Sequence, residues 1–176
     1  MSSYKHRGWT WMVWVALLAL PTSEGCRAQA TPLDSAHFTT IVMPVGGDPD
    51  AVAVADVNHD GKPDIIAANP SSGTVTVLLG DGKGHFHPAA GSPFPAGHLP
   101  SDIGIGDFSG DGNLDLVLPN HQTPYVTLLL GDGKGGFHPM PGSPFALPGC
   151  TSPRRVAIGD VTGDGIQDFV ITCMNS

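Results

Sequence analysis

The chain has 176 residues, of which 24 are Gly and 17 are Pro, while only 7% are aromatic and 14% are charged. This content of Gly and Pro excludes a helical bundle, because both residues are unfavourable inside helices. A hydrophobic share of 40% argues against a disordered chain. The formal net charge of −8 repels phosphate backbones and anionic lipid, so we expect no nucleic-acid partner.

Residues 1–30 have the organisation of a secretory signal peptide. Basic residues at 5–7 precede an uncharged stretch at 9–20, and a polar segment ends in Ala-Gln-Ala at 28–30. As a helix the uncharged stretch would rise about 18 Å, short of the ~30 Å hydrocarbon core, so no stable membrane span is expected after cleavage. Cleavage before Cys26 as a lipoprotein is disfavoured, because Ser23 stands where an aliphatic residue belongs. We expect cleavage after Ala30 and a secreted, periplasmic or cell-surface protein.

The acidic residues of the remaining segment, 31–176, are all Asp. Nine of these fifteen Asp lie in three windows, residues 56–64, 107–115 and 160–168, which share the pattern D-x-[N/S/T]-x-D-G-x-x-D. The windows begin 51 and 53 residues apart, and residues 80–88 and 91–94 return 51 positions later with few changes. A repeat of about 50 residues is typical of propellers and repeat arrays.

Each repeat predicts four strands, which in the first copy are residues 52–55, 65–68, 74–79 and a segment from Phe86 onward. The first strands alternate large residues with Ala or Gly, as expected of an innermost strand against which neighbouring sheets crowd. We therefore expect an all-β fold, a partial β-propeller of about two and a half to three four-stranded antiparallel blades that is not closed, since closure takes four to eight. The repeats are placed at about 36–86, 87–137 and 138–176, the last incomplete.

The acidic windows predict up to three Ca²⁺ sites. Positions 1, 3, 5 and 9 present side-chain oxygens, position 7 adds a backbone carbonyl, and Gly at position 6 permits a sharp turn. Hard oxygen donors without His or Cys favour Ca²⁺ over transition metals. The candidate ligands are Asp56, Asn58, Asp60, Lys62 and Asp64; Asp107, Ser109, Asp111, Asn113 and Asp115; and Asp160, Thr162, Asp164, Ile166 and Asp168, with Lys62, Asn113 and Ile166 acting through their carbonyls.

Two alternatives to a Ca²⁺ site exist for these windows. Asp, Asn and Gly also make good turns, but a turn needs one or two such residues and gives no reason for Asp at three fixed offsets. An EF-hand needs Glu at position 12, where this chain has Ala67, Leu118 and Ile171, and helices where strands are expected here. The EF-hand is excluded.

The three windows, with Val-Leu-Leu-Gly-Asp-Gly-Lys-Gly-His-Phe at residues 77–86, resemble the FG-GAP/VCBS repeats of bacterial secreted proteins. Those repeats are similar to the calcium-binding blades of integrin α-subunit propellers. The resemblance implies a blade array, Ca²⁺ in the loop between the first two strands, and a role in extracellular recognition or adhesion. Ser109 and Thr162 stand where family members often have Asp or Asn, so the site with Asn58 is expected to be the tightest.

The chain does not supply a closed propeller. Residues 37–45 are interpreted as the outer strand of a missing blade, and the third repeat stops after its second strand. Open ends of an array expose apolar faces, so either the chain is a truncated fragment or chains self-associate through these ends.

The leading function is a calcium-stabilised, non-catalytic module that binds an extracellular protein. The alternatives are a glycan-binding, lectin-like propeller and a fragment without a function of its own. Lectin sites usually stack sugars on Trp or Tyr. Residues 31–176 contain no Trp and a single Tyr, Tyr125. The motif Gly-Ser-Pro-Phe lacks the context of a nucleophile elbow, and the Gly-rich segment 80–84 lacks the Ser or Thr of a phosphate loop. We therefore expect no enzyme.

Two cysteines remain in residues 31–176, Cys150 and Cys173, and export favours their oxidation. Antiparallel pairing across the third acidic window would place Cys173 opposite about residue 155. A loop that doubles back after Pro148 and Gly149 could then bring the two sulfurs together, so Cys150 and Cys173 form a candidate disulfide.

Overall fold

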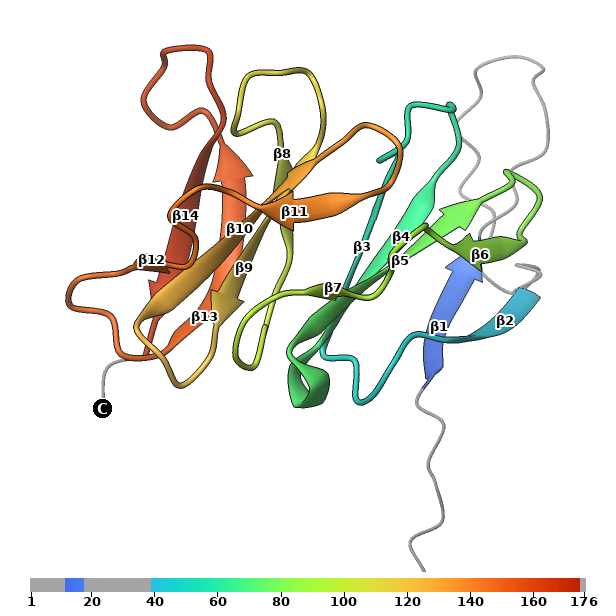
Figure 1. Cartoon of the computed structure of the whole chain (residues 1–176), viewed down its shortest axis with the longest axis horizontal. Helices are drawn as coiled ribbons and strands as arrows, with labels where there is room; N and C mark the ends of the chain where they lie inside the picture. Colours follow the sequence, from blue (N-terminus) through green and yellow to red (C-terminus); the bar gives the residue numbers. More distant parts are fainter. Residues whose placement is uncertain (1–11, 18–38, 175–176) are drawn as a thin grey trace, which may run out of the picture.

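The structure, a computed structural model, describes residues 12–17 and 39–174, and these residues form strands joined by turns (Figure 1). Apart from Met12–Leu17, the expected signal peptide lies outside the described residues. Within the described part the one helical segment is a 3-10 turn, η2 (Pro70–Ser72). No helix in that part is long and apolar enough to cross a membrane.

Two similar antiparallel sheets form the centre of the molecule. In the first, blade 1, the order is β3 (Ala51–Ala55), β4 (Asp64–Asn69), β5 (Thr74–Gly80) and β6 (Phe86–Pro88), and β7 (Phe94–Pro95) also pairs with β5. In blade 2 the order is β8 (Gly104–Gly106), β9 (Asp115–Asn120), β10 (Tyr125–Gly131) and β11 (Phe137–Pro139), with β12 (Phe145–Ala146) also on β10. Blade 3 consists of β13 (Pro153–Gly159) and β14 (Asp168–Cys173). The expected all-β, open array of propeller-like blades is confirmed.

The predicted fourth strand of each blade is divided into two short strands that pair with the same neighbour. In blade 1, β6 pairs with one end of β5 and β7 with the other. Between them the Ser92 hydroxyl accepts a hydrogen bond from the Val77 N–H at 2.9 Å, where an uninterrupted strand would offer a carbonyl. In blade 2 the Ser143 hydroxyl accepts from the Leu128 N–H at 2.9 Å. The repeated Gly-Ser-Pro-Phe motif thus completes the sheet at the interruption.

The blades stack face to face, with one apolar core in each interface. Ile66 and Val77 of blade 1 pack with Leu116 and Leu118 of blade 2 in the first core. A second core joins blade 2 to blade 3. The small residues of the innermost strands permit this approach, since a Cβ on Gly104 would lie 2.7 Å from Ile158 Cδ1 of blade 3. The predicted crowding of innermost strands is present between these two blades.

Strand β2 (Thr39–Pro44) pairs with β1 (Met12–Leu17) and packs on the other face of blade 1. The Val45 carbonyl accepts a hydrogen bond from Thr76 Oγ1 at 2.7 Å. In the next blade the equivalent carbonyl, that of Ala96 after β7, accepts from Asn120 Nδ2 at 2.9 Å. Thus β2 occupies the outer-strand position of a blade that would precede blade 1, as expected for residues 37–45, of which 37 and 38 lie outside the described part.

Candidate functional site

The three acidic windows form the loops that join β3 to β4, β8 to β9 and β13 to β14. All three loops lie along one edge of the array, the upper edge in Figure 1. The strand registers are the same in each blade: Asp64 pairs with Ala55, Asp115 with Gly106 and Asp168 with Gly159. The sheet therefore fixes the first and ninth positions of each loop next to each other.

The first-position carboxylates accept hydrogen bonds from several backbone N–H groups of their own loop. Asp56, Asp107 and Asp160 each accept a hydrogen bond through Oδ2 from the N–H of the glycine at position 6, at 2.8, 2.9 and 2.8 Å. The Oδ1 atoms accept from backbone N–H groups at position 4 or 5. A carboxylate oxygen that accepts one hydrogen bond retains a free lone pair, so this arrangement leaves oxygens for a cation.

The fifth-position carboxylates are exposed and bind backbone two residues later. Asp60, Asp111 and Asp164 each accept through Oδ1 from the N–H at position 7, at 3.0, 2.8 and 2.9 Å. In the first loop Asn58 Oδ1 accepts from the Asp60 N–H at 3.2 Å, and Asp56 Oδ1 accepts from the same N–H at 3.1 Å. The oxygens of positions 1 and 3 therefore converge there on one side of the loop.

The ninth-position carboxylates have a different environment from the others. Asp64 and Asp115 are completely buried. Asp64 Oδ2 accepts from the Val57 N–H at 3.0 Å, and its Oδ1 accepts from the Gly80 N–H at 2.9 Å. Asp115 makes the same two contacts, with Phe108 at 3.0 Å and Gly131 at 2.9 Å. These two side chains connect the acidic loop to the end of the third strand of the blade.

Hydrogen bonds lower the pKa of two loop carboxylates, those of Asp111 and Asp160. The Asn113 N–H, and after it the Asn113 side-chain amide, hold the pKa of Asp111 below the usual 3.8. The N–H groups of Gly165 and Gly163 lower the pKa of Asp160 in the same way. At neutral pH both carboxylates are available as anionic ligands.

The donor set fits Ca²⁺ in kind, because every side-chain donor is a hard oxygen. Across the described residues, however, no three side chains of His, Cys, Asp or Glu gather around one point. In the first two loops the ninth carboxylate is occupied by backbone N–H groups, which leaves positions 1, 3 and 5 and the carbonyl of position 7 as the accessible donors.

A cationic side chain that the sequence analysis assigned only a carbonyl role lies on the first loop. Lys62 Nζ is 3.2 Å from Asp60 Oδ2, so the fifth-position carboxylate already has a partner. In the second loop the Asn113 amide takes this place at 3.1 Å from Asp111. The third loop has the apolar Ile166 at the same position. Position 7 therefore places a cationic competitor in the first loop, a neutral hydrogen-bond donor in the second and neither in the third.

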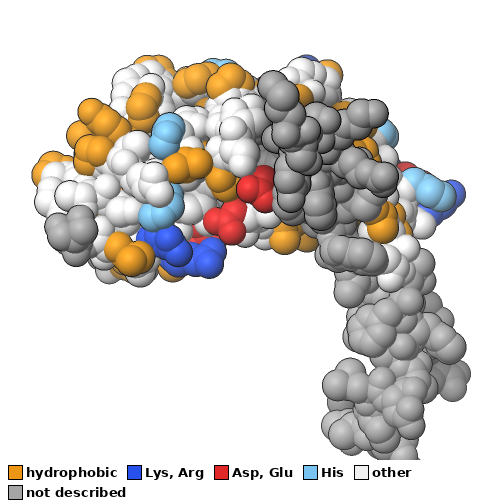
Figure 2. Space-filling view, turned by 90° about the horizontal axis from the view of Figure 1, so that it is seen from below, with side chains coloured by type: hydrophobic (Ala, Val, Ile, Leu, Met, Phe, Trp, Pro, Cys, Tyr) orange, Lys and Arg blue, Asp and Glu red, His pale blue; other side chains and the backbone are white. Residues whose placement is uncertain are grey.

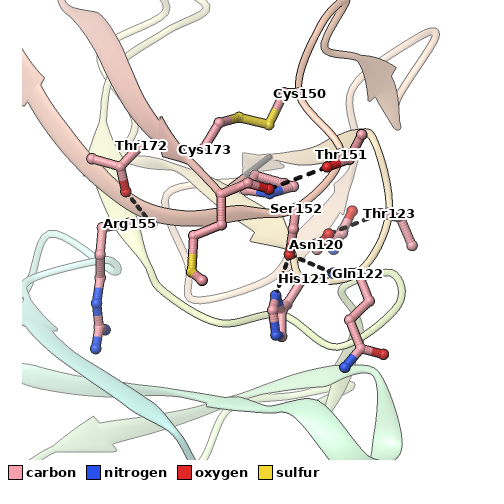
Figure 3. Close-up of a disulfide and its surroundings, with 12 residues drawn as sticks. Asn120, His121, Gln122, Thr123, Cys150, Thr151, Ser152, Arg155, Thr172 and Cys173 are labelled. Atoms are coloured by element: carbon pink, nitrogen blue, oxygen red, sulfur yellow. Dashed lines mark hydrogen bonds between the residues drawn. A yellow bond between two sulfur atoms is a disulfide. The ribbon is translucent and has the colours of Figure 1, made fainter. Parts of the chain in front are cut away.

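The described structure joins Cys150 and Cys173 in a disulfide, with their Cα atoms 5.5 Å apart (Figure 3). Cys173 pairs with Pro153 rather than with residue 155. The pairing of Gly159 with Asp168 accounts for one residue of this displacement, and the irregularity between Pro153 and Arg155 accounts for the second. The register expected from sequence was therefore displaced by two residues, and the loop beginning at Cys150 still reaches Cys173.

A Ser–His contact lies close to this disulfide (Figure 3), with Ser152 Oγ 2.7 Å from His121 Nδ1. Arg154 Nη1 lies 3.1 Å from His121 Nε2. A guanidinium only donates, so Nε2 is the acceptor and Nδ1 carries the proton. Ser152 Oγ thus accepts from His121, and also from the Gln122 N–H at 3.3 Å. The imidazole does not act as a base toward this hydroxyl, and the contact links blade 2 to blade 3.

Residues 56–118 match the family model described as an FG-GAP-like repeat. The chain contains an FG-GAP-like repeat. The matched segment begins at the first position of the first acidic loop and ends within β9. It includes two complete acidic loops and every strand of blade 1 except β3. The predicted FG-GAP family is confirmed for this segment. Among curated proteins and among solved structures no match to the chain was found.

Proposed function

We propose that this protein is a secreted, non-catalytic module whose blade loops bind Ca²⁺ and whose ordered surface binds an extracellular protein. One observation carries the proposal: three loops 51 and 53 residues apart repeat the same hydrogen-bond pattern with the same Asp positions. A turn that served only to reverse the chain would not need carboxylates at both positions 1 and 5 of every copy.

Binding of Ca²⁺ would couple directly to order in the loops. The candidate ligands lie within nine residues of sequence and are held by backbone N–H groups, while the third loop is exposed along its whole length. A cation shared by positions 1, 3 and 5 would neutralise carboxylates that otherwise repel each other. The ordered loops line one edge of the array, and this edge is the surface we assign to partner binding.

Thermal unfolding of the secreted protein in EGTA and in millimolar Ca²⁺ tests the metal part of this proposal. Extracellular sites typically have dissociation constants of about 10⁻⁴ to 10⁻³ M, so ~10 mM Ca²⁺ should add about 1.4 to 2.7 kcal/mol per site. We expect Asp60→Ala to reduce the Ca²⁺-dependent rise in Tm. The matched control, Asp50→Ala, removes an exposed Asp of blade 1 outside the loop and should leave the rise unchanged. Melting curves that coincide with and without Ca²⁺ would refute the metal site.

Export and recognition need separate measurements. The N-terminal sequence of the protein recovered outside the cell tests cleavage after Ala30. Binding of the Ca²⁺-loaded protein to an array of extracellular-matrix proteins and to a glycan array, each repeated in EGTA, tests the partner class. Calcium-dependent binding to proteins supports the proposal, whereas binding confined to glycans would favour the lectin-like alternative.

A further inference from the structure

Equivalent residues of the three blades differ sharply in exposure at the two ends of the array. On the innermost strand of blade 1, Val52 and Val54 are 52% and 61% exposed. Their equivalents in blade 2, Ile103 and Ile105, pack against the core shared with blade 1. In blade 3, Val156 and Ile158 likewise pack against the core shared with blade 2. This face of a blade therefore contacts the preceding blade wherever one is present. We name Val52 and Val54 the leading patch.

The opposite face of blade 3 shows the reverse pattern. Val170 is 52% exposed, whereas Ile66 and Val117 at the same position of blades 1 and 2 are completely buried. Val161, at the second position of the third acidic loop, is 67% exposed, while Val57 in the first loop is 2% exposed. We name Val161 and Val170 the trailing patch. Figure 2 shows hydrophobic side chains gathered at the end of the molecule where blade 3 lies.

The leading and trailing patches are complementary in shape as well as in polarity. Within the chain, the large side chains of one innermost strand lie against the small residues of the preceding one, as Ile158 lies against Gly104. The trailing side of blade 3 offers Ala157 and Gly159 at the corresponding positions. The contact between blades 2 and 3 is thus a template for a contact between the trailing patch and a leading patch.

The strand pairs at the two ends of the chain are also complementary halves of a blade. Met43 pairs with Val13 and Pro44 with Met12, in the same register in which Phe94 pairs with Val75 and Pro95 with Thr74. The pair β1–β2 therefore corresponds to the outer half of a blade. The pair β13–β14 has the register of β3–β4 and corresponds to the inner half. Figure 1 places these halves at opposite ends of the array.

We propose that two copies of this chain associate head to tail, with the trailing patch of each copy on the leading patch of the other. Among the described strands that remain after the expected cleavage, each chain has two complete blades and parts of a third, with the outer strand β2 at one end and β13 and β14 at the other. Two such sets give six blades, within the four to eight of closed propellers. Closure of one chain on itself would give three blades, below that range. A head-to-tail contact forms a closed ring when its rotation closes, and here the blade stacking sets that rotation. The patches lie within residues 39–174, so the contact does not require Met12–Leu17 or bound Ca²⁺.

Sedimentation velocity of the full secreted protein at micromolar concentration tests this assembly. We expect a mass of two chains. Val54→Lys removes every leading patch and Val170→Lys removes every trailing patch, so each variant alone should have the mass of one chain. Both side chains are exposed within one chain, so circular dichroism should show unchanged folding. Ala90→Lys, which adds the same charge to an exposed turn of blade 1, is the matched control and should keep the mass of two chains.

Mixing the two variants distinguishes a head-to-tail contact from a symmetric one. Val54→Lys retains its trailing patch and Val170→Lys retains its leading patch, so an equimolar mixture can form one intact contact and should recover the mass of two chains. The proposal is overturned if the unmodified protein has the mass of one chain, if it forms particles larger than two chains, or if the mixture remains monomeric.

Discussion

The Asp64 carboxylate and the Gly80 backbone N–H are hydrogen-bonded at 2.9 Å across 16 residues of sequence, inside the protein. Asp64 is completely buried, and its second oxygen accepts from the Val57 N–H. This carboxylate therefore fastens the start of the acidic loop to the end of β5. It has a structural task that the other carboxylates of the loop do not share.

Asp64→Ala and Asp60→Ala should differ greatly in their effect on the free energy of unfolding in the absence of Ca²⁺. Asp64→Ala leaves two buried N–H groups without an acceptor, each worth about 1–3 kcal/mol, so the free energy of unfolding in EGTA should fall by several kcal/mol. Asp60→Ala removes an exposed side chain and should change that free energy by about 0.5 kcal/mol or less. Urea unfolding in EGTA measures both. Equal losses for the two variants would contradict the distinction.

The hydroxyl of Ser92 should stabilise blade 1 through the interrupted outer strand. Ser92→Ala leaves the Val77 N–H unpaired inside the sheet, which predicts a loss of about 1–2 kcal/mol. Ser143→Ala should cost a similar amount, because it exposes the Leu128 N–H to the same loss. Ser71→Ala is the control, since its hydroxyl is exposed and bonds only to Asp48. Chemical unfolding of the three variants provides the comparison, and a Ser92→Ala protein as stable as the control would contradict it.

Lys62 should weaken cation binding at the first loop. Its ammonium forms an ion pair with the Asp60 carboxylate. An exposed ion pair of this kind contributes about 0.2–1 kcal/mol. Lys62→Met removes the competitor and keeps the length of the side chain, so calorimetry should show Ca²⁺ affinity at this loop increased about two- to fivefold. Lys83→Met, in the neighbouring hairpin, serves as the control for net charge. If both variants shift affinity equally, the effect is general electrostatics and the specific competition is wrong.

The disulfide should stabilise blade 3 more than any other part of the chain. Cys150 and Cys173 are 23 residues apart and enclose β13 and the third acidic loop. A cross-link over a segment of this length contributes about 3 kcal/mol in the chain-entropy description. The double variant Cys150→Ser and Cys173→Ser should lower the free energy of unfolding by about that amount and increase amide exchange in β13 and β14. Mass spectrometry of the unreduced protein checks the bond itself, since two alkylatable thiols in residues 31–176 would exclude it.

The Asp81 carboxyl should titrate unusually low. A hydrogen bond from the His85 imidazole, with Nδ1 2.6 Å from Oδ2, lowers its pKa from 3.8 to about 2. Because the folded-state pKa is depressed, its contribution to stability is present above pH 3.8 and is lost as the pH falls through about 2. A ¹³C NMR titration measures the value directly. His85→Gly, which reproduces the residue at the same place in blade 2, should return the pKa toward 3.8, and an unchanged value would refute the assigned cause.

Short-range patterns in the sequence were sufficient to predict the repeat, its strands and its loops. The Asp windows at 56–64 and 107–115 fix the period, and alternating residues such as those at 52–55 indicate strands, because a strand presents successive side chains to opposite faces. The resemblance to FG-GAP repeats rested on the same local motifs, and the family match at 56–118 confirms it. These features depend on neighbours within about ten residues, so the sequence alone contains them.

Only the tertiary structure determines how equivalent residues of the repeats differ in burial and hydrogen bonding. Val57 and Val161 occupy the same position of their loops, but Val57 is buried at an interface between blades and Val161 is open at the end of the array. Likewise, nothing in the pattern of Asp residues separates Asp64 from Asp60, whereas the structure buries Asp64 against the end of β5. The physical reason is the same in both cases. Burial and hydrogen bonding depend on which segment packs opposite a residue, and that segment lies far away in sequence or in another blade.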